Sequence, residues 1–451
     1  MIVVKFGGTS VADAEAIRRA AAITRGRLAR RPIVVVSALA GATNALLGIA
    51  EHAVGGRLIV AVREVEELRR RHLDEAAKLL GDGPESNEVQ AELSAMCDEL
   101  ASLAEALSVL GHLTPRSQDA IAAIGEELSS TLVAATFVRC GLPVDLVDAR
   151  RVMITDDHYT RAAPRLDAMA RAGREILLPL VSAGRVPVLA GYIGANEQGV
   201  TTTLGRGGGD FTAALLGAAL GAEAIEIWTD VDGMLTADPR VVPGARLLED
   251  VRFDEASELA TFGAKVLHPS TIAPAVLRDI PVFIYNSRRP EGRGTRVTAD
   301  APRRPVTALA GKPGVSVVQV RSPRMLNATG FMDRIFAVFS RHRVSVDVIA
   351  TSEVSVSLTV DDTAPLEELI GDLTALGDVS VERQRAIVAV VGAGLGDDSR
   401  TLARALAALD GIPLRMVSLS ATRINLTLVV DADRMAPALT ALHAAFFEGA
   451  A

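Results

Sequence analysis

Short β-branched runs alternate with helical stretches along the first half of the chain. Residues 2–6 and 33–37 are such runs, and residues 13–30 between them are helical in character, which predicts a βαβ unit. The alternation continues as helix 125–140 and strand 143–148, helix 165–183 and strand 186–190, and helix 210–220 and strand 224–229. It predicts an α/β fold in which an open, mainly parallel sheet has helices on both faces.

A charge-rich helical segment interrupts this alternation at residues 57–112. Acidic and basic residues recur along it, as in Arg63-Glu64, which is typical of a helix that faces solvent. We expect a surface-exposed helical excursion with no chemistry of its own.

The C-terminal part of the chain contains an internal repeat. Residues 288–305 concentrate Arg, Pro, Gly and Asp, so we place a domain boundary there. Beyond it, the strand-like run 344–349 recurs at 412–417, and 358–360 recurs at 426–428 with the same offset. An amphipathic helix precedes each copy and another follows it. The pattern predicts two βαββαβ units, and domains at residues 1–300, 301–384 and 385–451.

The composition is that of a globular protein whose core is built from aliphatic side chains. Hydrophobic residues make up 49% of the chain, and aromatic residues only 3%. The formal net charge is −8 and the basic residues are scattered, so we expect no nucleic-acid partner.

Neither a targeting segment nor a metal site is indicated. The N-terminus lacks the basic and apolar regions of a signal peptide, and no window has the ~18 consecutive apolar residues of a membrane span. Cys97 and Cys140 are far apart and the histidines occur singly, so we expect no disulfide and no metal held by protein ligands. We therefore expect a cytoplasmic protein without membrane contact.

A lysine and two glycines stand at the end of the first predicted strand, at Lys5, Gly7 and Gly8. Glycines let backbone N–H groups approach phosphate oxygens, and the following helix adds its positive N-terminal end. Lys5 can reach the same phosphates. Taken alone, the segment is equally typical of a tight turn with a solvated lysine, and no P-loop motif occurs in the chain.

A second glycine-rich segment, residues 201–210, combines three threonines with Arg206 and Asp210. A guanidinium can bind a carboxylate through two N–H groups, and a carboxylate can accept from an ammonium, so the pair suits a zwitterionic ligand. A purely structural glycine loop would need neither charge.

A third segment follows the predicted strand 224–229. Thr229 and Asp230 at its carboxyl end suit a nucleotide and its Mg²⁺, although the Asp-Gly and Asp-Pro sequences nearby are also ordinary turn sequences. Residues 261–269 add a Gly-Ala-Lys sequence, which alone is a weak signal. No Ser–His–Asp or Cys–His combination is evident. This fits phosphoryl transfer, where catalysis is mostly positioning and charge neutralisation.

Together these segments resemble the motifs of aspartate kinases, in the order of that family. The resemblance rests on residues 5–11, 203–208, 228–231 and 262–269, and the paired C-terminal units resemble the two ACT domains of the lysine-sensitive, monofunctional type. It implies an amino-acid-kinase fold and ATP-dependent phosphorylation of the side-chain carboxylate of L-aspartate, with Mg²⁺ accompanying ATP. This reaction is the first step of lysine, threonine and methionine biosynthesis. A homodimer through the ACT-like units, or a dimer of such dimers, is also implied.

The resemblance assigns roles residue by residue. Lys5, Arg206 and Asp210 are implied to be catalytic, with Lys5 neutralising charge on the transferring phosphoryl group. The residues implied to hold aspartate are Ser37, Thr43, Glu126, Arg206 and Asp210. Those implied at the ATP site are Lys5, Gly7, Gly8, Thr229, Asp230, Leu235, Arg240, Lys265 and Val266.

Two positions depart from the family pattern. Gly209 stands where a serine is common, and Leu235 stands where a nucleotide-contacting tyrosine is common. Neither change removes a charged participant, so we expect altered affinity and retained activity.

For regulation we expect feedback inhibition by L-lysine, because residues 345–355 resemble the first ACT unit of lysine-sensitive aspartate kinases. Asp347 supplies a carboxylate for a ligand ammonium. The residues expected to form this allosteric site are Met325, Phe331, Met332, Ser345, Asp347, Thr351 and Ser352. The alternative is a site that has lost its ligand or prefers threonine.

Two other functions compete with this one. Kinases of the same superfamily that act on acetylglutamate, glutamate or a nucleoside monophosphate lack the duplicated C-terminal unit, which argues against them. A non-catalytic amino-acid sensor is opposed by the joint presence of four charged residues, namely Lys5, Arg206, Asp210 and Asp230. Because the chain ends at Ala451 without a second dinucleotide fold, we expect no fused homoserine dehydrogenase.

Overall fold

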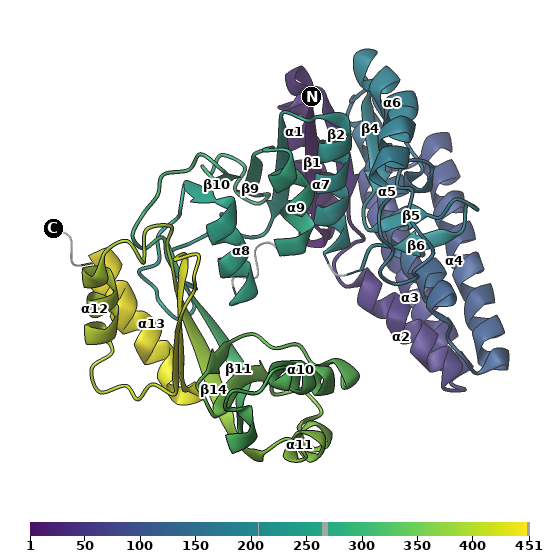
Figure 1. Cartoon of the computed structure of the whole chain (residues 1–451). Helices are drawn as coiled ribbons and strands as arrows, with labels where there is room; N and C mark the ends of the chain where they lie inside the picture. Colours follow the sequence, from purple (N-terminus) through teal and green to yellow (C-terminus); the bar gives the residue numbers. More distant parts are fainter. Residues whose placement is uncertain (206, 264–268, 449–451) are drawn as a thin grey trace. The chain divides into compact units, whose positions relative to one another are not determined.

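The computed structural model describes residues 1–205, 207–263 and 269–448. The chain divides into two compact units (Figure 1). One comprises Met1–Gly233 and Leu267–Ala299, and the other comprises Met234–Val266 and Asp300–Ala451. The expected domain boundaries at residues 300 and 384 remain predictions.

The first unit is built around a mainly parallel sheet. Its strands are β1 (Ile2–Phe6), β2 (Pro32–Val36), β3 (Val144–Leu146), β4 (Val186–Ala190), β7 (Ala224–Thr229), β9 (Val282–Asn286) and β10 (Thr295–Thr298). Within this unit they lie in the order β3-β4-β2-β1-β7-β9-β10. Neighbours pair in parallel except β9 and β10, which are antiparallel. A separate hairpin joins β5 (Ile193–Ala195) to β6 (Thr201–Thr203).

Helices cover both faces of this sheet (Figure 1). They are α1 (Ala14–Arg25), α2 (Ala42–Val54), α3 (Leu58–Leu80), α4 (Pro84–Leu110), α5 (Pro115–Arg139), α6 (Leu166–Ser182), α7 (Gly208–Leu220) and α9 (Pro269–Leu277). Helices α6 and α7 pack against β2 on one face, where α7 also contacts α9. On the other face α5 packs against β2, β3 and β4 and contacts α1. The predicted α/β fold is confirmed.

The central strands β1 and β2 are buried at every residue. They lie in the middle of a sheet with helices on both faces, which explains their continuous β-branched runs. Side chains of β1 alternate between the two faces, so that Val4 and Phe6 enter the main core together with Trp228. Lys5 lies between them in the sequence and faces α7.

Helices α3 and α4 form the predicted helical excursion, but one face of it is not exposed. Ala61, Val65, Leu93 and Leu100 are buried in the main core, where α3 and α4 pack against α5. The expectation of a surface-exposed excursion is therefore wrong for this apolar face. The charged residues that suggested exposure occupy the other face of each helix.

Helix α5 is the most apolar long helix among the described residues, and by length and composition it could cross a membrane. However, 83% of its most apolar window is buried inside the protein. It contacts α2, α4 and three strands of the sheet. This is the environment of a core helix.

The second unit contains one antiparallel sheet and the helices that cover it. The strands of this sheet are β11 (Ala308–Arg321), β12 (Ile349–Thr351), β13 (Ser355–Asp361), β14 (Asp378–Val391), β15 (Met416–Leu419) and β16 (Asn425–Asp431). The unit also contains the short strand β8 (Asp250–Arg252), which is not part of this sheet. Its helices are α8 (Phe253–Thr261), α10 (Phe331–Arg341), α11 (Leu366–Thr374), α12 (Ser399–Ala408) and α13 (Met435–His443). The sheet has the order β12-β13-β11-β14-β16-β15.

The two predicted repeats share their central strands in this sheet. The second half of β11 pairs with β13 of the first repeat, and β11 pairs with β14 along most of its length. The first half of β11, residues 308–313, lies beside residues 386–391, which in turn pair with β16 of the second repeat. A strand that precedes the first repeat in sequence therefore completes the sheet of the second.

The first strand of each repeat is shorter than predicted. The run 344–349 becomes regular strand only at Ile349, and the run 412–417 only at Met416, so both predictions are wrong at their N-terminal ends. Around Asp347, the Thr359 carbonyl accepts the Asp347 N–H at 3.1 Å. The Val348 N–H, however, donates to the Thr359 hydroxyl at 2.9 Å. A side-chain acceptor thus replaces a ladder bond and interrupts the strand.

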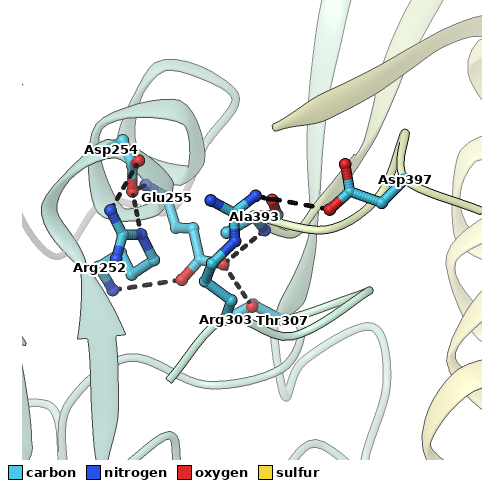
Figure 2. A network of polar contacts seen from close by, with 7 residues as sticks. All are labelled: Arg252, Asp254, Glu255, Arg303, Thr307, Ala393 and Asp397. Carbon is cyan, nitrogen blue, oxygen red and sulfur yellow. Dashed lines mark hydrogen bonds and ion pairs between the residues drawn. The ribbon is translucent and has the colours of Figure 1, made fainter. Parts of the chain in front are cut away.

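A buried carboxylate attaches α8 to this sheet. Figure 2 shows Glu255 between Thr307, which precedes β11, and Ala393, which follows β14. Glu255 is fully buried and accepts from the Thr307 hydroxyl at 2.7 Å and from the Ala393 N–H at 2.8 Å. A second contact joins the Asn425 amide to Glu258 at 2.5 Å. Hydrogen bonds to charged groups are the strong ones, so α8 is firmly anchored to the sheet.

Candidate functional site

The carboxyl ends of the central strands meet at one edge of the first unit's sheet. Phe6 at the end of β1 lies opposite Val36 of β2 and Trp228 of β7. The segments after these strands therefore start side by side, where open α/β sheets place their ligands. Backbone hydrogen bonds join them, because the Gly7 N–H donates to the Trp228 carbonyl at 3.0 Å and the Ser37 N–H to the Phe6 carbonyl at 3.1 Å.

Lys5 and Asp210 form an ion pair at this edge. Lys5 Nζ lies 2.7 Å from Asp210 Oδ1, and the two side chains are 10% and 18% exposed. Asp210 is in the first turn of α7, where a negative charge is favoured by the helix dipole. An ammonium has three N–H donors, so Lys5 can hold Asp210 and a phosphate oxygen at the same time.

Glycines allow the backbone to approach this pair closely. A Cβ at Gly8 would lie 2.9 Å from the Ala38 carbonyl oxygen. A Cβ at Gly209 would lie 2.8 Å from Ser37 Oγ and 3.1 Å from Lys5 Cε. A larger residue at position 209 would therefore require Ser37 and Lys5 to shift. Gly209, which departs from the family pattern, leaves both side chains in place.

Glu126 of α5 is a buried carboxyl group. It is only 4% exposed. Burial raises the pKa of Glu126 to about 8, while a hydrogen bond from the Ala38 backbone and the charge of Lys5 act in the opposite direction. Among the described residues Oε2 has no hydrogen-bond partner. The group can therefore still accept a hydrogen bond from a ligand.

The segments after β2 and β7 supply hydroxyl groups and a carboxylate. Ser37 follows β2 directly, and its carbonyl accepts from the Ser129 hydroxyl at 2.7 Å. Thr43 is half-buried in the first turn of α2. Thr229 ends β7, and its hydroxyl donates to the exposed Asp230 carboxylate at 3.3 Å. The structure therefore places these predicted residues at or just beyond the carboxyl ends of the central strands.

The remaining predicted ATP-site residues are not part of the described first unit. Leu235 and Arg240 belong to the second unit, where Leu235 is half-buried and the exposed Arg240 pairs with Asp238 at 2.6 Å. The predicted site residues that lie outside the described part of the chain are Arg206, Lys265 and Val266.

In the second unit, the carboxylate predicted to bind a regulator is paired with a cation of the protein itself. Asp347 Oδ2 lies 2.7 Å from Lys312 Nζ, which also lies 2.8 Å from Asp361 Oδ1. Asp347 therefore already has an ammonium partner in the structure.

The other predicted allosteric residues divide into apolar and hydroxyl groups. Phe331, the first residue of α10, is buried in the hydrophobic core of this part of the sheet, and Met325 and Met332 pack against that core. The exposed residues are Ser345, Thr351 and Ser352.

Two buried polar residues of the first unit were not predicted. Ser10 is 1% exposed, and its hydroxyl contacts the Trp228 carbonyl at 3.0 Å and the Ser287 hydroxyl at 2.8 Å, which ties the glycine turn to β7. Asp119 is also 1% exposed and lies about two helical turns before Glu126 on α5. That spacing is the only sequence signal for Asp119, and helical carboxylates at such spacings are common.

Two protein families match the chain. The Amino acid kinase family matches residues 1–286, and the ACT domain matches residues 388–446. Among curated proteins, the lysine-sensitive aspartokinase 3 of Escherichia coli is 37% identical over 99% of both chains. The chloroplastic aspartokinase 3 of Arabidopsis thaliana is 35% identical over 99% of this chain and 81% of the relative.

Solved structures agree with these matches. The crystal structure of E. coli aspartokinase III in complex with aspartate and ADP has a TM-score of 0.86, with 36% identity over 99% of this chain and 100% of that one. The same enzyme in complex with lysine and aspartate has a TM-score of 0.83, with 36% identity over 99% of both chains.

Proposed function

The chain belongs to the aspartokinase family and is an aspartate kinase, and we propose that its chemistry takes place at the edge where β1, β2 and β7 end. The reaction transfers the γ-phosphoryl group of ATP to the side-chain carboxylate of L-aspartate. The observation that supports this location is the Lys5–Asp210 ion pair, together with the buried carboxyl group of Glu126. These groups offer one cation to a phosphate and two carboxyl groups to a ligand ammonium.

On the ATP side, we assign Lys5 to the transferring phosphoryl group. Its ammonium neutralises charge that develops on the phosphoryl oxygens. Gly7 and Gly8 let the backbone lie against the phosphates, and the Gly8 N–H is the donor we assign to them, because the Gly7 N–H is bonded to the Trp228 carbonyl. The residues that complete the proposed nucleotide site are Thr229, Asp230, Leu235, Arg240, Lys265 and Val266.

On the aspartate side, we assign Asp210 and Glu126 to the α-ammonium and Arg206 to a carboxylate, with hydroxyl contacts from Ser37 and Thr43. The attacking group is a carboxylate, which is already ionised at neutral pH, so no general base is required. The protein then has to hold this carboxylate in line with the γ-phosphorus and to neutralise charge.

A divalent metal ion accompanies ATP in this class of reaction, and we propose Mg²⁺. In the part of the chain that the structure describes, no group of three or more His, Cys, Asp or Glu side chains is arranged to hold a metal. Mg²⁺ usually binds substrate phosphates and one or two carboxylates instead of an all-protein cage, and the exposed Asp230 fits that role. The ion would neutralise charge on the phosphate oxygens.

The proposed activity is tested by measuring ADP formation with L-aspartate, L-glutamate and N-acetyl-L-glutamate as acceptors. We expect ADP release that depends on aspartate, with little activity on the two longer acceptors. Absence of aspartate-dependent turnover would indicate a non-catalytic sensor. A preference for acetylglutamate would assign another substrate to the site.

Arg206→Lys is expected to raise KM for aspartate by about ten-fold or more and to leave KM for ATP nearly unchanged. Lysine keeps the charge but loses the planar fork that binds a carboxylate through two N–H groups. Initial rates with each substrate varied in turn measure both constants. Arg165→Lys is the control, because Arg165 forms an exposed ion pair with Glu197. An equal rise for both substrates would indicate collapse of the whole segment and reject the specific role.

For regulation, we propose that L-lysine binds the first of two ACT-like domains, at residues 301–384 and 385–451, and inhibits catalysis by residues 1–300. Asp347 supports this proposal because it already binds the ammonium of Lys312 in the structure. The residues assigned to the site are Met325, Phe331, Met332, Ser345, Asp347, Thr351 and Ser352.

L-Lysine at millimolar concentration is expected to raise the apparent KM for aspartate by about 5- to 150-fold, the usual range of allosteric coupling. Asp347→Ala should remove this response. Asp361→Ala is the matched control, because Asp361 also contacts Lys312 but is not assigned to the site. Saturation curves for aspartate at several lysine concentrations, with threonine in parallel, measure the effect. No response to lysine, or a response to threonine alone, would reject the proposal.

We also propose a cytoplasmic homodimer formed through the C-terminal sheet, with a dimer of dimers as a larger assembly. Among the described strands β12 pairs only with β13, and Ile349 on β12 is 41% exposed. An edge strand with exposed apolar residues favours pairing with a second chain. Size-exclusion chromatography with light scattering measures the mass, and a monomer at micromolar concentration would contradict the proposal.

A further inference from the structure

We propose that Asp119 is a positioning residue that sets the distance between Glu126 and the end of β6, three residues before Arg206 in the sequence, and thereby the affinity for L-aspartate. The inference rests on the proposed function of these two residues. Asp119 lies in the first turns of α5 and is 1% exposed. A carboxylate buried to this extent needs strong hydrogen-bond donors around it.

The donors to Asp119 come from two separate chain segments. The Thr203 N–H donates to Oδ2 at 3.0 Å, and the Thr203 hydroxyl donates to Oδ1 at 2.6 Å. The Thr160 N–H lies 2.9 Å from Oδ2 and 3.1 Å from Oδ1. Burial raises the pKa of Asp119, and these hydrogen bonds act in the opposite direction. One side chain therefore holds β6 and the segment around Thr160 against α5.

The segment held in this way leads directly into the glycine-rich loop. Thr203 ends β6, and Leu204 and Gly205 follow it immediately before Arg206. Gly205 has φ +79°, and a Cβ there would lie 3.1 Å from the Thr160 carbonyl oxygen. Thr160 itself has φ 70°, which is unusual for a β-branched residue and requires support from its surroundings. Asp119 provides that support.

Helix α5 connects this anchor to the proposed ammonium site. Asp119 and Glu126 are seven residues apart, so they share one helix face about 10.5 Å apart along the axis. In the proposed site, Glu126 binds one end of aspartate and Arg206 binds the other. The affinity for aspartate therefore depends on the distance between Glu126 and the end of β6, which leads to Arg206. A displacement of about 1 Å is enough to weaken such a contact strongly. The proposed ATP contacts follow other strands and do not depend on Asp119.

Asp119→Asn replaces one acceptor oxygen by an N–H₂ group, so it is expected to raise KM for aspartate by about ten-fold and to change KM for ATP by less than about two-fold. Thr203→Val removes the hydroxyl group, which donates to Asp119 and also hydrogen-bonds with the Tyr192 side chain, and keeps the N–H donor. It should act in the same direction with a smaller effect. Thr203→Ser keeps the hydroxyl and should behave like the wild type. The increase in KM for aspartate in the double variant D119N/T203V should be smaller than the sum of the two single effects in free energy, because both changes break the same contact.

Asp156→Asn is the matched control. Asp156 accepts from the His158 and Ala163 N–H groups in the segment that contains Thr160, and these bonds do not involve β6. Both KM values should stay unchanged in this variant, and thermal melting should show that each variant is folded.

Hydrogen exchange of the Thr203 amide is measured alongside, and it should be faster in Asp119→Asn whatever the turnover. If the wild type lacks aspartate-dependent activity, the proposed function is wrong. Hydrogen exchange then still tests whether Asp119 holds Thr203 in place, and an unchanged exchange rate in Asp119→Asn would reject the positioning role. With an active wild type, an unchanged aspartate KM in folded Asp119→Asn and Thr203→Val, or an equal rise of both KM values, would overturn the inference. If Asp119→Asn does not fold, Thr203→Val alone decides between these outcomes.

Discussion

Lys5→Ala is expected to lower kcat by about 100-fold or more while the protein remains folded. The Lys5 ammonium is 2.7 Å from Asp210 and its side chain is only 10% exposed, so it acts where charges interact more strongly than in water. Without it, the charge that develops during phosphoryl transfer loses its cation. Steady-state rates at saturating ATP and aspartate measure kcat, and circular dichroism with thermal melting reports the fold.

Lys78→Ala is the matched control for this substitution. Lys78 lies on α3, its side chain is 60% exposed, and it pairs with Glu75 at 2.6 Å. The Lys78 side chain lies mostly in solvent and has no role in the proposed site, so kcat should not change. If Lys5→Ala retains kcat within a few-fold of the wild type, Lys5 has only a structural role and the proposed catalytic edge is wrong.

The affinity for aspartate is expected to rise by up to about ten-fold per pH unit as the pH increases towards 8. The pKa of Glu126 is about 8 in the free protein, so this carboxyl group is mostly protonated at neutral pH. An ammonium ligand favours the ionised form, so binding must release a proton. Calorimetric titrations in two buffers of different ionisation enthalpy measure the number of protons released, which should approach one at pH 7.

Glu126→Gln should bind aspartate more weakly and should abolish both the proton release and the pH dependence. Glu127→Gln is the control, because the neighbouring carboxylate pairs with Arg150 at 2.8 Å, and it should leave both unchanged. A pH-independent affinity in the wild type would show that Glu126 does not bind the ammonium.

The raised pKa of Glu126 also predicts a pH-dependent stability. The ordinary pKa of this group is 4.5, so its contribution to stability is fully present below that pH and is lost as the pH rises through about 8. Glutamine is uncharged at every pH and avoids this loss. Glu126→Gln should therefore have a higher free energy of unfolding than the wild type above pH 8, measured by chemical denaturation.

The regulatory part shows how far a repeat in the sequence predicts a sheet. The recurring helices and strands predict two similar units, and α10, α11, α12 and α13 lie where the pattern places them. The pattern does not reveal that β11 pairs with β14 and so contributes to both units. Strand pairing over such distances depends on which hydrophobic faces meet in the folded protein, and a local repeat does not encode that choice.

In the catalytic part, the sequence by itself determined the strands β1, β2, β3, β4 and β7 and the chemistry of individual segments, whereas β5, β6, β9 and β10 were not predicted. Strands β4 and β7 have the bounds predicted for them, because burial in a parallel sheet requires continuous apolar runs that are visible locally. Lys5 and Asp210 were each recognised from residues within their own segment, since glycines and charges after a strand are a local signal.

Only the tertiary structure decided which of these groups meet and how they titrate. The Lys5–Asp210 ion pair joins β1 to α7, and no sequence pattern predicts that these two side chains lie within contact distance. Glu126 looks like any helical glutamate, and its function was suggested only by the family resemblance. Its raised pKa comes from burial by residues far along the chain. Asp119 is a still clearer case, because its donors Thr160 and Thr203 are brought to it only when α5 packs beside β6.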